Sequence, residues 1–179
     1  MADCDEQQIM RLLSEAATQR KGFELLVRSY SEQLYWLIRK IVLTHEDAND
    51  VLQNTFLKAW NGLDSFHGDA KISTWLSRIA INESLDFLRR NKQQTTSMDE
   101  TPLTSLMADD YFDGSAAEAL LQEAIATLPD VQRTVFLLRY FDEKKYSEIS
   151  ELLQTSEGAL KASYHIAVKK ITEYFKSRD

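Results

Sequence analysis

Apolar residues recur every three or four positions along most of the chain, the spacing that places them on one face of an α-helix. Four helices are predicted in the first half of the sequence. The first contains Ile9 and Leu12 and is expected to end near Gly22, because glycine commonly follows the last turn of a helix. The other three are predicted over residues 23–41, 45–60 and 72–90, with Thr44 as the N-cap of the third.

The second half of the sequence predicts four further helices. The first covers residues 120–128 and is stopped by Pro129, whose ring disfavours a helical conformation at the preceding residue. A helix over 131–138 follows, and then a pair over 146–153 and 157–175. A short helix, a three-residue turn and a longer helix describe a helix-turn-helix. Ser150 is small where the pair should cross, and Ser156 is placed to cap the second helix.

Residues 93–117 separate the two halves and have a different character. This stretch is polar, contains Pro102 and Gly114, and shows no sustained helical period. It carries five acidic side chains and no basic one. We therefore predict an all-α protein with two small helical domains, 1–92 and 118–179, joined by an acidic flexible linker.

Composition narrows the classes of protein that the chain can represent. Only 5 glycines and 2 prolines occur among 179 residues, too few for the turns of a β-sandwich or barrel. One cysteine, Cys4, and three dispersed histidines predict no disulfide, no metal site and no cofactor. No catalytic constellation is evident, so we expect a protein that is not an enzyme. Without a secretory signal or a long apolar run, a cytoplasmic protein without membrane association is expected.

Charge is distributed unevenly along the chain. The formal net charge of −7 would usually disfavour nucleic-acid binding. However, the linker accounts for most of the excess of acidic over basic side chains, and each flanking domain has a net charge of only −1. Residues 71–92 contain five basic side chains against two acidic ones. A local basic face is therefore predicted within an acidic protein.

Four strings occur in a specific order, with the linker before the last of them: DANDVLQNTFLKAW (47–60), LDSFHGD (63–69), STWLSRIAINESLDFLRR (73–90) and LPDVQRTVFLLRYFDEKKYSEISELL (128–153). Together they resemble a bacterial RNA polymerase sigma factor of the extracytoplasmic-function class, over residues 23–175. The resemblance implies a non-enzymatic subunit that binds polymerase core. It also implies recognition of −10 and −35 promoter elements and help in opening the DNA.

The resemblance implies that one face of the helix over 45–60 contacts the clamp helices of the polymerase. The matching positions are Asp47, Asp50, Gln53, Asn54 and Leu57. Asp50 and Gln53 are the expected anchors, and Leu57 would add an apolar contact. Related sequences usually have an acid at the position of Asn54, so its bond is expected to be weaker. The alternative is an ordinary solvated helix surface.

The resemblance implies that the loop over 63–70 and the start of the next helix form a pocket for a base flipped out of the −10 element. The residues assigned to −10 binding are Gly62, Phe66, Lys71, Trp75, Arg78, Asn82, Arg89 and Arg90. Asn82 offers a hydrogen-bond donor and an acceptor, and Trp75, Arg78 and Asn82 are expected to share a helix face. A tryptophan at helical spacing is more often a core residue, so packing is the favoured alternative for Trp75. The arginines at 89 and 90 would also complement the helix dipole.

The last helix is expected to read the −35 element. The candidate contacts are Ser156, Lys161, Ser163, Tyr164, His165 and Lys169. Ser163, Ile166 and Val168 stand where the family frequently has arginine, so guanine recognition by bidentate arginine is weaker or moved. Ala159 and Leu160 fit either thymine methyl contacts or packing, and packing is favoured.

The implied partners are polymerase core, through its clamp helices and flap, promoter DNA in double-stranded and melted form, and an anti-sigma factor. Because the chain is acidic, its affinity for isolated duplex DNA is expected to be low. Assembly on the polymerase must therefore supply most of the affinity for the promoter. The linker acids fit either a nucleic-acid mimic inside the polymerase channel or a plain tether. Two other readings are a stand-alone helix-turn-helix regulator and a protein-binding adaptor, but neither explains the strings over 63–90.

Overall fold

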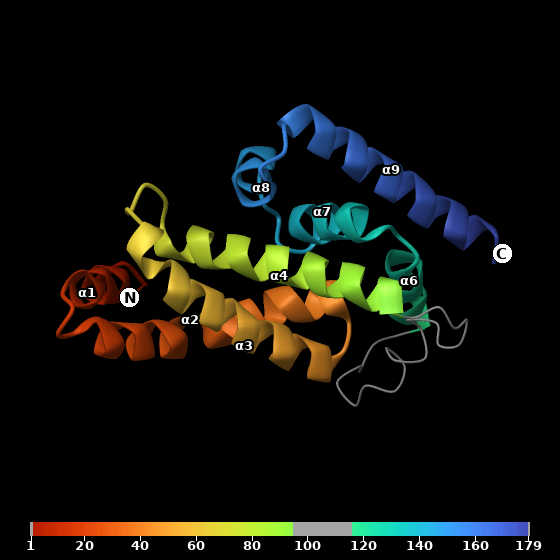
Figure 1. Ribbon diagram of the computed structural model, residues 1–179. Coiled ribbons are helices and arrows are strands. Elements are labelled where there is room, and N and C mark those ends of the chain that lie inside the picture. Colours follow the sequence, from red (N-terminus) through yellow and green to blue (C-terminus); the bar gives the residue numbers. More distant parts are fainter. Residues whose placement is uncertain (1, 95–115, 179) are drawn as a thin grey trace.

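The computed structural model describes residues 2–94 and 116–178, and all regular structure within these ranges is helical (Figure 1). The predicted all-α class is therefore confirmed. The elements are α1 (Ala2–Ser14), α2 (Gln19–Val42), α3 (His45–Gly62), the 3-10 turn η1 (Leu63–Ser65), α4 (Ile72–Gln94), α6 (Ala116–Ala126), α7 (Asp130–Tyr140), α8 (Tyr146–Leu153) and α9 (Glu157–Lys176).

Helices α1 to α4 form an N-terminal unit around one apolar core. The predicted capping residue of α3 is confirmed, since the Thr44 hydroxyl accepts a hydrogen bond of 3.2 Å from the backbone N–H of Asp47. Ala48, Val51 and Ala59 turn one side of α3 into this core. The opposite side of α3 is left to solvent, which makes it available to a partner.

The first helical boundary differs from the sequence prediction. Helix α1 ends at Ser14, whereas a termination near Gly22 was expected. Gly22 is buried inside α2, and a Cβ atom built there would lie 2.8 Å from the Cβ of Leu12. The glycine therefore allows α1 and α2 to approach closely and does not end a helix.

Helices α6 to α9 form a C-terminal unit that contains the predicted helix-turn-helix. Helices α8 and α9 are separated by residues 154–156, as expected. Gln154 adopts a left-handed conformation with φ of 52°, and the Ser156 hydroxyl accepts a hydrogen bond from the N–H of Ala159. Leu160, on the inner side of α9, is 1% exposed, so the packing interpretation of this residue is confirmed.

The two units are packed against each other along α4 (Figure 1). Ile81 of α4 and Ile41 of α2 are buried in the same apolar cluster as the inner side chains of α7 and α9. Helices α7 and α8 both contact α4. The second core is therefore built partly from the first unit, an arrangement that the sequence analysis did not predict.

A buried arginine joins the units at the end of α2. Arg133 is 3% exposed, and its Nη2 donates to the carbonyl of Ile41 at 3.1 Å and to Asp130 Oδ1 at 3.2 Å. Asp130 also accepts a hydrogen bond of 2.8 Å from Lys92, and Lys40 pairs with Asp142. Burial lowers the pKa of Arg133 and Asp130 opposes this shift, and arginine remains charged at neutral pH. A cation is thus held against carbonyls at a helix C-terminus, where the dipole favours it.

The ends of the predicted linker carry helical structure. Helix α4 continues to Gln94 and α6 starts at Ala116, both inside the range 93–117. The remaining stretch, 95–115, with all five acidic residues, lies outside the described residues. The two interpretations of the acidic residues therefore stay predictions.

We expect Arg133→Ala to loosen the contact between the units, because it removes the donor to the Ile41 carbonyl. The loss should weaken the contact by about 1–3 kcal/mol. Small-angle X-ray scattering should then show a larger radius of gyration. Arg178→Ala is the matched control, because Arg178 pairs at 2.9 Å with Glu123 inside the C-terminal unit. An unchanged radius for Arg133→Ala would contradict the role given to this residue.

Candidate functional site

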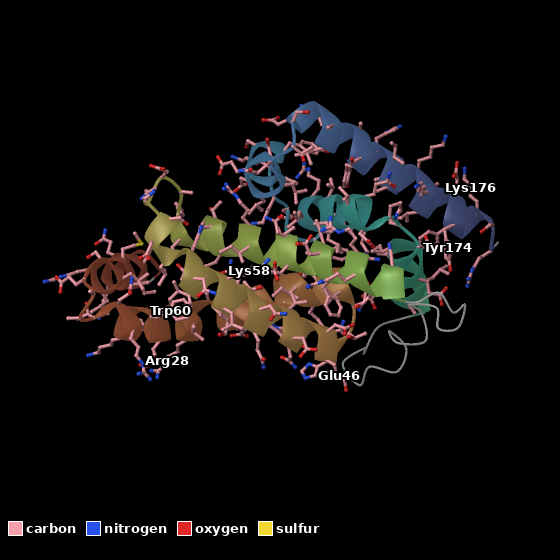
Figure 2. The ribbon with its side chains drawn as sticks, viewed as in Figure 1. Arg28, Glu46, Lys58, Trp60, Tyr174 and Lys176 are labelled. Atoms are coloured by element: carbon pink, nitrogen blue, oxygen red, sulfur yellow. The ribbon has the colours of Figure 1, made fainter. Side chains whose placement is uncertain are left out.

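The outer side of α3 presents the candidate polymerase-binding residues together. Asp50, Gln53 and Asn54 are exposed, and Leu57 is 61% exposed. Their spacing puts them on neighbouring turns of one helix face. Figure 2 labels Glu46 and Trp60 at the two ends of this helix. The face combines a carboxylate, two amides and a large apolar side chain without an intramolecular covering.

Asp47 lies at the N-terminal end of the same face and also has a structural role. It is half-buried, and its backbone N–H is held by the Thr44 cap. The pKa of Arg39 is lowered by burial, while Tyr35 and Asp47 act in the opposite direction. The Arg39 guanidinium also donates to the carbonyl of Leu43 at the end of α2. Asp47 is therefore partly engaged by its own chain.

Trp60 extends the exposed apolar surface of α3 and was not singled out from the sequence. It is 41% exposed, and its ring meets the Phe23 ring edge-on at a centroid distance of 4.9 Å. The signal that identifies it is helical spacing, because Trp60 follows Leu57 by three residues and Gln53 by seven. Leu57 and Trp60 together make an apolar patch beside the polar anchors.

Arg90 lies beside the outer face of α3 and not beside the other −10 candidates. It lines a shallow cavity together with Asp50, Gln53 and Asn54. The sequence analysis had grouped Arg90 with Arg89, but successive residues on a helix point in different directions. Arg89 pairs with Asp86 at 2.8 Å and lines a different cavity.

The segment between α3 and α4 is shaped by local hydrogen bonds and one glycine. The hydroxyl of Ser65 donates to the Gly62 carbonyl at 2.8 Å, and the N–H of Phe66 donates to the Leu63 carbonyl at 3.1 Å. Gly68 has a φ of +79°, which favours glycine. The segment turns the Phe66 ring onto Trp75, with ring centroids 4.8 Å apart and planes 32° apart.

A cavity of about 910 Å³ opens beside this aromatic pair and lies between the two units. The candidate −10 residues that line it are Gly62, Trp75, Asn82 and Arg89. Lys58 of α3, labelled in Figure 2, pairs with the nearly buried Glu83 on its wall. Asp130 and Val131 of α7 close the far side. Trp75 is only partly buried, so it serves both core packing and the cavity wall.

Arg78 and Lys71 line a second cavity, between α4 and α8. This cavity is lined from α8 by Glu148 and Glu151. Arg78 Nε is buried without a hydrogen-bond partner in the part of the chain that the structure describes. Helical spacing puts Arg78 roughly 60° around α4 from Trp75, so the common face of Trp75, Arg78 and Asn82 stays a prediction. Trp75 and Asn82 line the first cavity, whereas Arg78 lines the second, which α8 covers.

The outer face of α9 presents most of the candidate −35 residues. Lys161, His165 and Lys169 are exposed, and Ser163 is half-buried. Lys161 pairs with Glu157 at 3.8 Å and Lys169 with Glu173 at 3.9 Å. Such exposed pairs contribute little, so the cations remain available to phosphates. Ser156 is committed to capping the helix.

Tyr164 points to the interior of the C-terminal unit. Its ring stacks on Phe136 with centroids 5.7 Å apart and meets Tyr146 edge-on at 6.4 Å. The spacing of Leu160, Tyr164, Ala167 and Ile171 is that of a helical core stripe, which is the signal that identifies its packing role.

The described ranges lack two features, a cluster of metal ligands and a membrane-spanning helix. Residues 2–94 and 116–178 contain no group of three or more histidine, cysteine, aspartate or glutamate side chains that could hold a metal ion. Nor is any helix in these ranges long and apolar enough to cross a membrane.

Two family models match the chain. The model described as Sigma-70 region 2 matches residues 26–94, and the model described as Sigma-70, region 4, matches residues 118–171. The first match contains α3, the following segment and α4, and the second contains the helix-turn-helix.

Proteins with similar sequences carry related descriptions. The chain is 32% identical over 156 residues to the ECF RNA polymerase sigma factor SigW of Bacillus subtilis, covering 80% of this chain and 83% of that protein. It is 35% identical over 153 residues to the ECF RNA polymerase sigma factor SigM of Mycobacterium tuberculosis, covering 84% and 76%. A similar match, 35% over 156 residues with coverage of 83% and 88%, is found to the sigma factor YlaC of Bacillus subtilis.

Solved structures share the fold. CnrH, solved in complex with the cytosolic domain of CnrY, superposes with a TM-score of 0.68 at 22% identity, covering 98% of this chain and 99% of that chain. The sigma factor RpoE of Bartonella quintana, solved with the anti-sigma factor NepR, gives 0.66 at 22% identity, with coverage of 87% and 98%. By its two matched regions and its relatives, this chain belongs to the extracytoplasmic-function class of RNA polymerase sigma factors, alternative sigma factors that act in transcription initiation.

Proposed function

We propose that the outer face of α3 is the surface that binds the clamp helices of RNA polymerase core. The observation that carries this proposal is Leu57, a large apolar side chain that is 61% exposed between polar residues on one helix face. Asp50 and Gln53 would supply the directed bonds and Leu57 and Trp60 the apolar area. Arg90, which shares a cavity with Asp50, fits this surface better than a DNA contact.

The cavity beside Phe66 and Trp75 is proposed to take a base of the −10 element. A base that leaves the stack loses a few kcal/mol of free energy, which a shaped pocket with edge hydrogen bonds must offset. Trp75 offers an apolar wall, with Phe66 packed against its ring, and Asn82 offers a donor and an acceptor in the lining. The proposed set comprises Gly62, Phe66, Trp75, Asn82 and Arg89, with Lys71 and Arg78 as phosphate contacts in the second cavity.

The exposed face of α9 is proposed to lie in the major groove at the −35 element. Lys161, His165 and Lys169 would contact DNA there, with Ser163 at the edge of the face. Tyr164 is left out of this set, because its ring is packed against Phe136.

Promoter binding requires the two units to separate. Helices α7 and α8 lie against α4, and their acidic residues Asp130, Glu148 and Glu151 line the same cavities as the proposed −10 residues. DNA cannot occupy these cavities while α7 and α8 close them. We infer that binding to polymerase core, which uses the separate face of α3, accompanies the opening.

Two further elements of the proposal concern the cellular setting. Because RpoE of Bartonella quintana was solved with the anti-sigma factor NepR, we infer an anti-sigma partner for this chain as well. We also infer a cytoplasmic location, contacts with the polymerase flap through the C-terminal unit, and no catalytic activity of its own.

The test of the whole proposal is transcription with sigma-free core on a genomic fragment library. Discrete starts that share two upstream motifs at fixed spacing are expected, whereas their absence would favour a stand-alone regulator or an adaptor.

The double substitution Asp50→Ala and Gln53→Ala should weaken the affinity for polymerase core by about tenfold to a hundredfold, because two directed bonds are lost. Fluorescence anisotropy of labelled protein titrated with core measures this affinity. Gln7→Ala with Glu32→Ala is the matched control, since both residues are exposed on other helices. Equal core affinity in all three proteins would contradict the assignment of the α3 face.

The double substitution Lys161→Ala and Lys169→Ala should reduce the salt dependence of −35 binding. Each lost phosphate contact lowers the slope of log affinity against log salt by about 0.9. The measurement uses holoenzyme and a duplex that carries only the upstream motif. Lys21→Ala, on the remote helix α2, is expected to leave the slope unchanged. An unaltered slope in the double variant would exclude these lysines from the DNA contact.

A further inference from the structure

Helix α1 lies outside the matched region 26–94, yet it packs at a functionally important end of the bundle. Figure 1 shows α1 at the same end of the N-terminal unit as the segment between α3 and α4. Ile9 of α1 is 0% exposed, and Ile72 at the start of α4 is 1% exposed in the same apolar cluster. The helix is therefore an integral part of the core next to the proposed −10 segment.

Glu6 of α1 is hydrogen-bonded to the first residue of α4. The backbone N–H of Ile72 donates to Glu6 Oε1 at 3.0 Å, across 66 residues of sequence. The first amides of a helix have no partner within the helix, and a negative charge there is favoured by the helix dipole. Helix α4 has no acidic residue in its own first turn. Glu6 of α1 therefore provides the acidic group at the start of α4 that the sequence of α4 lacks.

The side chain of Met10 of α1 also lies close to the turn of the segment. Gly68 lies at the turn of the segment with φ of +79°, and a Cβ built on it would be 3.9 Å from Met10 Cε. Phe66 is held by its contact with Trp75, and Ile72 by Glu6. The segment is therefore supported from α4 at one end and from α1 at its middle and its other end.

We propose that Glu6 is a positioning residue for −10 recognition, through its hydrogen bond to the Ile72 amide. The inference rests on the proposed function of the cavity beside Trp75. Trp75 lies in the first turn of α4, where its N–H donates to the Lys71 carbonyl at 3.1 Å. Fixing the Ile72 amide fixes this turn, and with it the orientation of the Trp75 ring against Phe66.

The test compares Glu6→Ala with two controls on the same helix. Ile9→Val lowers the stability of α1 packing but keeps the hydrogen bond, and Gln7→Ala changes an exposed neighbour. Glu6→Gln keeps an acceptor oxygen without the charge. Each full-length variant is assembled with polymerase core. Its affinity is then measured for a single-stranded oligonucleotide that carries the non-template strand of a mapped −10 motif.

We expect Glu6→Ala to weaken oligonucleotide binding by about threefold to tenfold, the size of one helix cap, with unchanged core affinity. Glu6→Gln should fall between it and the wild type, and both controls should bind as the wild type does. Wild-type binding by Glu6→Ala, or an equal loss in Ile9→Val at a similar Tm, would overturn the positioning role.

The proposed −10 function is checked in the same experiment. If the wild type does not distinguish the motif from a scrambled oligonucleotide, or if Asn82→Ala has no effect, the −10 assignment fails and the inference fails with it. If the wild type discriminates and only Glu6→Ala remains unaffected, the inference alone fails.

Discussion

Helix α4 must pack on two sides, and the rest of the structure depends on this constraint. Its first half places Ile72, Leu76 and Ala80 in the core of the N-terminal unit. Ile81 turns into the cluster formed mainly by α7 to α9, and Leu85 and Leu88 pack against it. The C-terminal unit lies against α4 for this reason, and the Arg133 contact with the end of α2 reinforces the arrangement.

The same helix carries the residues proposed to contact the −10 element, so its two roles compete. The Trp75 side faces α7, and the Arg78 side faces the acidic residues of α8. Carboxylates of the C-terminal unit thus lie next to the basic side chains that are proposed to bind DNA phosphates. The outer face of α3, the proposed polymerase-binding surface, remains exposed in this arrangement. In this arrangement the basic side chains of an acidic protein are covered in the free protein and are proposed to become accessible in the assembled complex.

Local sequence rules predicted the helices well, because caps and helical periodicity depend on neighbouring residues. Thr44, Pro129 and Ser156 each mark a boundary that the structure confirms. The prediction that a helix ends near Gly22 was wrong, since the role of this glycine depends on the approach of Leu12 from another helix. Arg78 lines a different cavity from Trp75 and Asn82, because α8, about 70 residues away in sequence, covers its part of α4. The contact between Glu6 and Ile72 also depends on tertiary structure, and no local pattern indicates it.

In the free protein α4 is covered by the C-terminal unit, and we propose that it is released in the holoenzyme. Fluorescence energy transfer between dyes at Arg28→Cys and Lys176→Cys, in a Cys4→Ser background, would measure this change. These positions lie on the two units in Figure 2. We predict that the transfer measured in the free protein falls clearly when polymerase core is added. Transfer that stays unchanged in a transcriptionally active holoenzyme would contradict the account.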